Sequence, residues 1–166
     1  MKTKTLLFLF VYCLPLFCLA QNKEVFDKYN NPMLGTLICD INFTSVKDTS
    51  VKQNLYSLKA DSVYLFFYDP FCDRCHTEIK RLKKNKQLKK AIKDSSLIII
   101  SIAPDIDYYT WQKEVKHMPK QWINAYCFDN EKIIKSLLWK VPELFVLDKH
   151  KRILHINMYR QEFDDE

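Results

Sequence analysis

Two uninterrupted apolar segments on either side of a basic amphipathic segment most restrict how this chain can fold. They are residues 63–68 (Val-Tyr-Leu-Phe-Phe-Tyr) and 97–102 (Leu-Ile-Ile-Ile-Ser-Ile). Runs of this length and composition predict strands that are buried on both faces. Between them, apolar residues at helical spacing with lysines on the other face predict a helix over Thr77–Lys93. We therefore expect a right-handed βαβ unit in a parallel sheet that is covered on both sides.

The segments before and after this unit predict shorter elements. We expect one short strand within Leu34–Phe43, after a turn at residues 30–32. Downstream we expect a short helix, a brief strand, a second helix and a β-hairpin whose strands flank a polar turn. These elements cover residues 107–117, 123–128, 130–138 and, for the two hairpin strands, 144–147 and 153–158. The order β-α-β-α followed by two strands predicts an α/β fold with a mixed sheet.

The first twenty residues have the organisation of a cleaved secretory signal peptide. Lys2 and Lys4 give the N-terminus a positive charge, and an apolar run follows at residues 6–19. Residues 18–20 (Cys-Leu-Ala) form a small-x-small cleavage pattern. The run is shorter than the roughly 20 residues of a membrane-spanning helix, so no stable membrane span is expected after cleavage. Lipidation at Cys18 is the alternative, which the bulky Phe17 before it disfavours. We expect a periplasmic or secreted protein.

Residues 21–166 then form one domain. Cleavage after Ala20 leaves 146 of the 166 residues, enough to bury an ordinary hydrophobic core. The whole chain has a formal net charge of +6, and basic residues gather in residues 80–93 (KRLKKNKQLKKAIK). The simplest interpretation of this run is a solvated helix face. Because the run has no interleaved aromatic residues and the chain is predicted to be exported, nucleic acid is not an expected partner.

Cys72 and Cys75 lie between the first buried strand and the helix that follows it. A thiol at a helix start is surrounded by backbone N–H groups without helical partners and by the positive end of the helix dipole, which favour the thiolate. Arg74 adds positive charge between the two cysteines. A second cysteine three residues later lies one helical turn away, within reach of disulfide closure. The arrangement predicts disulfide exchange, with Cys72 as the nucleophile and Cys75 as the more buried resolving cysteine.

Two other kinds of site share the Cys-x-x-Cys pattern. Zinc requires two further ligands, and the sequence has no second Cys-x-x-Cys and no His-x₃-His, so no metal is expected. Residues 72–76 (Cys-Asp-Arg-Cys-His) match the attachment pattern of c-type haem. Haem attachment there would expel the preceding strand from the core, and the α/β pattern offers no obvious haem pocket. We therefore expect a redox pair that works without a cofactor.

Three segments together resemble the thioredoxin-like superfamily. They are the strand at residues 63–68, residues 67–78 (Phe-Tyr-Asp-Pro-Phe-Cys-Asp-Arg-Cys-His-Thr-Glu) and residues 139–148 (Trp-Lys-Val-Pro-Glu-Leu-Phe-Val-Leu-Asp). The likeness covers roughly residues 32–158 and is closest to the exported TlpA-like branch. It implies a central mixed β-sheet flanked by helices. It also implies an enzyme that exchanges disulfides with exported protein or small thiols, usually as a reductase, and an unidentified electron donor or acceptor.

The resemblance also implies roles for residues around the pair. The Val141–Pro142 peptide bond is expected to be cis, to face the disulfide and to leave backbone groups of Val141 free for a substrate chain. A trans proline that only opens a strand is the alternative. Glu78 is expected to tune the thiols and accept a proton, unless it is simply a first-turn helix glutamate. Phe71 replaces the tryptophan that commonly precedes the first cysteine, and is expected to bind substrate. Phe66 replaces the buried carboxylate of thioredoxin.

The last features concern the ends of the fold and the remaining cysteines. The chain continues for eight residues after Met158, so the resemblance implies little or no C-terminal helix. Cys39 and Cys127 are a candidate structural disulfide, whose long loop would constrain the unfolded chain by roughly 4 kcal/mol. Two buried free thiols are the alternative. The rival function is a non-catalytic thioredoxin-like binding module with a structural Cys72–Cys75 disulfide.

Overall fold

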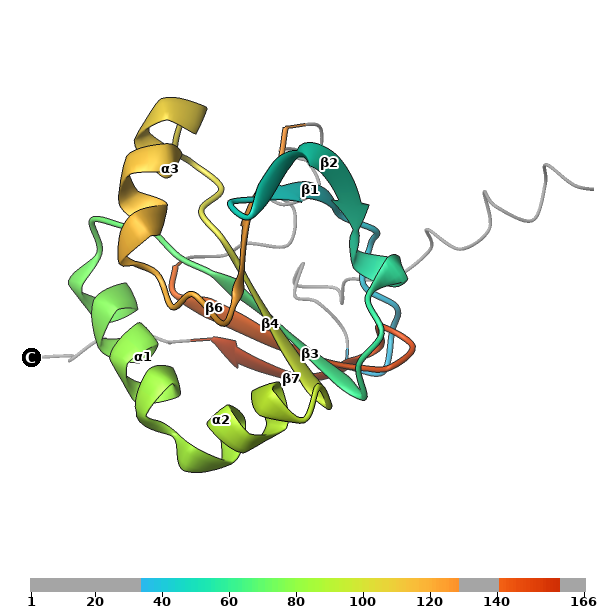
Figure 1. The fold of residues 1–166 in the computed structure, drawn as a ribbon. Coiled ribbons are helices and arrows are strands. Elements are labelled where there is room, and N and C mark those ends of the chain that lie inside the picture. Colours follow the sequence, from blue (N-terminus) through green and yellow to red (C-terminus); the bar gives the residue numbers. More distant parts are fainter. Residues whose placement is uncertain (1–33, 129–140, 159–166) are drawn as a thin grey trace, which may run out of the picture.

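Within the part of the chain that the structure describes, a seven-stranded mixed β-sheet forms the centre, with the longer helices gathered to one side (Figure 1). The computed structural model describes residues 34–128 and 141–158. The strands are β1 (Asn42–Ser45), β2 (Asp48–Asn54), β3 (Ser62–Phe67), β4 (Leu97–Ile102), β5 (Ile123–Tyr126), β6 (Glu143–Asp148) and β7 (Ile153–Met158). The helices are α1 (Asp73–Lys84), α2 (Lys86–Lys93) and α3 (Tyr108–Glu114), with 3₁₀ turns η1 (Leu55–Ser57) and η2 (Val115–His117).

The order of the strands across the sheet is β2-β1-β5-β4-β3-β6-β7. β3, β4 and β5 are parallel, whereas β6 pairs antiparallel with β3 and with β7. The hairpin of β1 and β2 joins the sheet through an antiparallel pairing of β1 with β5. α1 and α2 connect the adjacent parallel strands β3 and β4, so the βαβ unit predicted from the two apolar runs is confirmed.

Both faces of the central strands are buried, which explains why their sequences are apolar without interruption. Successive side chains of a strand point to opposite faces, so Val63 and Leu65 belong to one buried cluster and Phe66 to another. The first cluster, here called the hairpin-side core, also contains residues just before β1 and just after β2. The second, the helix-side core, contains Leu82 of α1 and Trp111 of α3. The helices therefore cover the face of the sheet toward which Phe66 points.

The single helix predicted over Thr77–Lys93 is wrong, because this segment holds parts of two helices. α1 begins four residues earlier than predicted, where Cys72 caps it. The helical path breaks at Asn85, whose side-chain oxygen accepts hydrogen bonds from the backbone N–H groups of Gln87 (2.9 Å) and Leu88 (3.1 Å). Asparagine bonds nearby backbone groups and so favours helix caps over helix interiors. Asn85 therefore ends α1 and starts α2.

The prediction of one short strand within Leu34–Phe43 underestimates this region. β1 begins at Asn42 and forms a hairpin with β2, while Leu37 makes only an isolated bridge with Arg152. β2 lies at the edge of the sheet, and its first five residues are exposed. A strand with no buried face carries no alternation of apolar and polar residues, so the sequence pattern did not reveal it.

The other described elements agree with the predictions. α3 and η2 lie within residues 107–117, β5 lies within 123–128, and β6 and β7 form the predicted C-terminal hairpin. The predicted helix over residues 130–138, the signal peptide over residues 1–20 and the end of the chain after Met158 lie outside the described residues. Within residues 34–128 and 141–158, no helix has the length and apolar character to cross a membrane.

A buried lysine stabilises the turn between β6 and β7. Lys151 is 2% exposed, and its Nζ donates hydrogen bonds to the backbone carbonyls of Leu58 and Lys149, each at 3.1 Å. Replacing Lys151 with alanine removes both hydrogen bonds and leaves the two carbonyls without these donors. We expect the free energy of unfolding to fall by about 2–3 kcal/mol, as measured by urea denaturation.

Lys149 provides the control for this prediction, because its side chain in the same turn is exposed. We expect Lys149→Ala to change the free energy of unfolding by no more than about 0.5 kcal/mol. Equal losses in the two variants would contradict the role assigned to the Lys151 ammonium group.

Candidate active site

Cys72 lies where the chain leaves the central sheet and enters α1. It is the N-cap of α1, and its sulfur accepts a hydrogen bond from the backbone N–H of Cys75 at 3.3 Å. The first N–H groups of a helix have no partners within the helix, and the positive end of the helix dipole lies beside them. A sulfur at this position supplies one missing acceptor and gains electrostatic stabilisation when it is negative. Cys72 is half-buried rather than enclosed, so it is the more accessible thiol of the pair.

Cys75 is closed to solvent on the first turn of α1. It is 0% exposed and belongs to the helix-side core. Burial, and next the hydrogen bond between this thiol and Cys72, raises the pKa of Cys75 to about 12. The pair therefore combines an accessible sulfur with a buried thiol that keeps its proton at neutral pH.

Asp69 is a site residue that the sequence analysis missed. Its backbone carbonyl accepts a hydrogen bond from the N–H of Cys72 at 3.2 Å, and its N–H donates to the sulfur of Cys75 at 3.4 Å. Its carboxylate accepts a hydrogen bond from the N–H of Phe71 at 2.8 Å, which fixes the turn before α1. The negative charge of Asp69 also contributes to the raised pKa of Cys75. Asp69 therefore positions both cysteines through its backbone groups. Because every non-proline residue has these groups, the sequence pattern does not reveal this role.

Phe71, Val141 and Pro142 are the residues predicted to bind substrate. The Phe71 side chain, directly before Cys72, is 68% exposed. Val141 is half-buried and packs against the helix-side core, as Cys72 does. The predicted cis peptide bond between Val141 and Pro142 is confirmed. An exposed aromatic ring thus directly precedes the accessible sulfur in the chain, and Val141 and Cys72 pack against the same buried cluster.

Solved structures from Bacteroides species share this fold, although no protein-family model and no curated protein matches the chain. The C-terminal domain of an uncharacterized protein from Bacteroides fragilis is 30% identical, with a TM-score of 0.66 and coverage of 76% of this chain and 89% of that one. A thioredoxin-like protein from Bacteroides caccae is also 30% identical, with a TM-score of 0.68. The match covers 85% of this chain and 48% of that one, so this chain spans about half of the length of that protein. The chain belongs to the thioredoxin-like superfamily.

A more distant structure carries an activity in its name. The thioredoxin domain of a thiol-disulfide oxidoreductase from Bacteroides vulgatus is 19% identical, with a TM-score of 0.64, and the match covers 76% of this chain and 89% of that one. At this identity the likeness concerns the fold alone. Membership of the TlpA-like branch of the thioredoxin-like superfamily stays a prediction.

Glu78 lies in this thioredoxin-like chain at the position where an acidic residue was expected to tune the thiols. It is 3% exposed, and its carboxylate accepts a hydrogen bond from Nε of Arg81 at 2.7 Å and a second from Nη2 of the same residue. The nearby charges that raise the pKa of Cys75 belong to Cys72 and Asp69. The predicted proton-accepting role of Glu78 therefore competes with a structural role in its ion pair with Arg81, and it stays a prediction.

The geometry disfavours haem attachment at residues 72–76. Covalent attachment requires both sulfurs to reach the porphyrin, and Cys75 is fully buried between α1 and the sheet. His76 of the same motif is exposed. Among the described residues, no group of three or more histidine, cysteine, aspartate or glutamate residues is arranged to hold a metal ion.

Cys39 and Cys127 are half-buried and pack against the hairpin-side core. Burial raises the pKa of Cys39 to about 11 and that of Cys127 to about 12. The structure holds both as free thiols, so the disulfide between them stays a prediction. Peptide mapping under non-reducing conditions would test it directly.

Three thiols with raised pKa values predict that the reduced protein loses stability at alkaline pH. The pKa rises on folding from 9.0 to about 11 for Cys39 and to about 12 for Cys75 and Cys127. Above pH 9 the unfolded chain releases these protons while the folded state keeps them, so unfolding becomes more favourable. Their contribution to stability is complete below pH 9 and is lost progressively as the pH rises toward about 12. We expect the Tm to fall steadily from about pH 9 to pH 11.

A double variant isolates these thiols from the other groups that titrate at alkaline pH. Cys39→Ala with Cys127→Ala removes two of the three and is expected to make the fall in Tm shallower. An identical pH dependence in this variant and the parent protein would refute the assignment.

Proposed function

We propose that this protein is a thiol–disulfide oxidoreductase that uses Cys72 as its nucleophile and Cys75 as its resolving cysteine. One observation carries the proposal. The accessible sulfur of Cys72 caps α1 and accepts a hydrogen bond from the Cys75 N–H, and the buried thiol of Cys75 is hydrogen-bonded to the same sulfur. A thiolate is the reactive form of a cysteine, and helix N-termini favour it. The solved thiol-disulfide oxidoreductase from Bacteroides vulgatus, which shares the fold, supports the same reaction class.

In the direction that we propose, the pair reduces a substrate disulfide in two steps. The Cys72 thiolate attacks one sulfur of the substrate, the substrate S–S bond breaks, and the departing thiolate takes up a proton. The Cys75 thiol then loses its proton and attacks the Cys72 sulfur of the mixed disulfide. The second substrate sulfur leaves, and the Cys72–Cys75 disulfide remains. Two electrons pass to the substrate, and a dithiol donor restores the pair.

The proposed substrates are disulfides of exported proteins or small thiols, with the protein in the periplasm or secreted. Phe71 offers an exposed aromatic surface beside the nucleophile. Val141 precedes β6 and packs, as Cys72 does, against the helix-side core, and an extended substrate chain would align its backbone with the start of this strand. The predicted signal peptide supports this location, and the electron donor or acceptor is a further exported thiol protein.

Trapping of the mixed disulfide tests the proposal. In Cys75→Ser the first step proceeds and the second cannot, so Cys72 is expected to retain substrates covalently until a reductant is added. The parent protein is expected to reduce insulin with dithiothreitol as the donor, and a redox titration then gives the potential of the pair. A potential below about −300 mV without insulin reduction would instead support a binding module with a structural disulfide.

The raised pKa of the resolving thiol provides a separate test of the two nearby acids. Asp69→Asn removes a charge that raises the pKa of Cys75, so we expect that pKa to fall and the attack of Cys75 on the mixed disulfide to quicken. In Glu78→Gln the pKa of Cys75 is expected to stay the same if Glu78 only pairs with Arg81. The pKa of Cys75 in each variant is measured in a Cys72→Ser background, from the pH dependence of its alkylation rate. A fall in the pKa of Cys75 in Glu78→Gln, with no fall in Asp69→Asn, would instead support the proton-accepting role of Glu78.

A further inference from the structure

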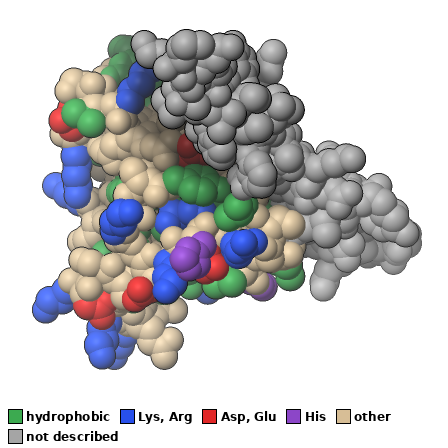
Figure 2. All heavy atoms as spheres, turned by 90° about the vertical axis from the view of Figure 1, so that its right-hand side faces the viewer, with side chains coloured by type: hydrophobic (Ala, Val, Ile, Leu, Met, Phe, Trp, Pro, Cys, Tyr) green, Lys and Arg blue, Asp and Glu red, His purple; other side chains and the backbone are tan. Residues whose placement is uncertain are grey.

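The net positive charge of this chain is concentrated on α1 and α2. The 21 residues Asp73–Lys93 hold nine lysine or arginine residues and two acidic residues, a net charge of +7. Because the whole chain carries +6, the remaining residues together carry −1. On the side of the molecule away from these helices, lysine and arginine side chains are interspersed with acidic ones (Figure 2). The proposed reaction uses the first turn of α1 and leaves this basic surface without a role.

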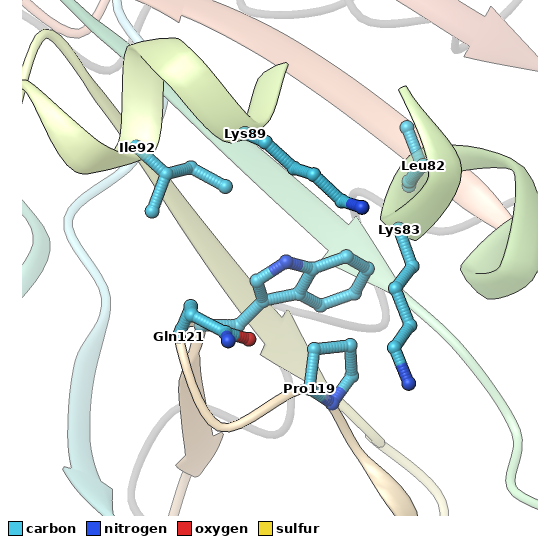
Figure 3. Close-up of a pocket in the computed structure, with 7 residues that line it drawn as sticks. Leu82, Lys83, Lys89, Ile92, Pro119 and Gln121 are labelled. Carbon is cyan, nitrogen blue, oxygen red and sulfur yellow. The ribbon is translucent and has the colours of Figure 1, made fainter. Parts of the chain in front are cut away.

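A groove of about 340 Å³ opens within the basic surface, between the two helices and the segment before β5. Its lining residues are Leu82, Lys83, Lys89, Ile92, Pro119, Gln121 and Trp122. Figure 3 shows Lys89 reaching from α2 toward Leu82, and Lys83 extending beside Pro119. Leu82 and Trp122 are each 3% exposed, whereas the two lysines are exposed. The groove therefore combines a buried apolar floor with cationic walls.

We infer that this groove docks an acidic peptide segment of a partner protein, with an apolar side chain over Trp122 and carboxylates beside Lys83 and Lys89. Charge complementarity decides the occupant. Ammonium groups on both helices face the groove, and further exposed lysines extend the positive surface beyond it: Lys80, Lys86, Lys90 and Lys93. These four lysines lie outside the groove and add to the positive potential around it, and long-range attraction of opposite charges speeds the encounter with an acidic chain.

The position of the groove explains how docking serves the reaction. Leu82 lies nine residues after Asp73 on α1, a distance of about 14 Å along the helix axis. A partner held at the groove therefore keeps a disulfide within a short reach of Cys72, which raises its effective concentration there. This consequence rests on the proposed function, whereas docking itself does not.

Peptide binding tests the inference without any thiol. A fluorescein-labelled peptide, Glu-Asp-Leu-Phe-Asp-Glu, is titrated with the full chain, and the anisotropy is measured at low salt and at about 150 mM salt. We expect saturable binding that weakens with salt, because exposed charges are screened. Lys83→Glu with Lys89→Glu is expected to lower the affinity at least tenfold. The matched control, Lys80→Glu with Lys93→Glu, makes the same charge change on the same helices outside the groove and is expected to lower the affinity less than threefold.

Three outcomes would overturn the inference. The first is an absence of saturable peptide binding to the parent protein. The second is equal weakening in the two double variants, both folded by circular dichroism, because binding would then depend on charge alone. The third is Lys83- and Lys89-dependent binding to phosphatidylglycerol vesicles that exceeds binding to the peptide, which would assign the surface to a membrane. Since the peptide has no cysteine, loss of insulin reduction with intact peptide binding would refute the proposed function only.

Discussion

Replacing Cys72 with serine is expected to lower the rate of insulin reduction by at least about 1,000-fold, to the uncatalysed background. A serine hydroxyl is not ionised at neutral pH and forms no stable bond with a disulfide sulfur, so the first step fails. The sulfur of Cys72 accepts the N–H of Cys75 as the cap of α1. Serine is a preferred N-cap residue, so this variant retains the cap and tests the chemistry rather than the fold.

The control for this prediction is the pair of cysteines outside the site. Cys39→Ser with Cys127→Ser leaves Cys72 and Cys75 unchanged and is expected to keep most of the activity. Activity that persists in Cys72→Ser and disappears in this control would move the redox site to the hairpin-side core. Thiol alkylation followed by mass spectrometry identifies which cysteines change their redox state during turnover.

The sequence predicted best the parts of the fold where burial dictates residue type. β3 and β4 lie in the middle of the sheet with both faces covered, so nearly every position in residues 63–68 and 97–102 is apolar. That constraint produced the correct βαβ unit and placed Cys72 at the start of a helix. The C-terminal hairpin was found for a related reason, because its polar turn separates two apolar strands.

The parts that the sequence did not predict depend on exposure or on backbone geometry. β2 is an exposed edge strand, so its residues carry no periodicity. The break at Asn85 depends on whether one side chain turns back to cap α2, which spacing alone does not reveal. Asp69 acts on the cysteines mainly through its main-chain N–H and carbonyl, which every non-proline residue has. These main-chain contacts follow from the position of Asp69 and not from its residue type.

Phe145→Ala is expected to cost about 3–5 kcal/mol of the free energy of unfolding, which is a large part of the roughly 5–15 kcal/mol of a typical domain. Phe145 lies in β6 and is 0% exposed. Its ring packs edge-on against Phe67 of β3, with the centroids 6.0 Å apart and the planes at 89°. Removing the ring leaves a cavity between rigid strands that neighbouring side chains cannot fill. Guanidinium denaturation followed by far-UV circular dichroism measures the loss.

Phe71→Ala provides the matched comparison, because the same substitution at an exposed ring separates stability from function. Phe71 is 68% exposed, so its removal opens no cavity and is expected to change the free energy of unfolding by no more than about 0.5 kcal/mol. If this ring contacts substrate beside Cys72, the variant raises the KM for insulin while the protein remains folded. Phe145→Ala should instead lower the fraction of folded protein and leave the KM of the folded molecules unchanged. Equal losses of stability in the two variants would contradict the assignment of Phe145 to the core and of Phe71 to the substrate surface.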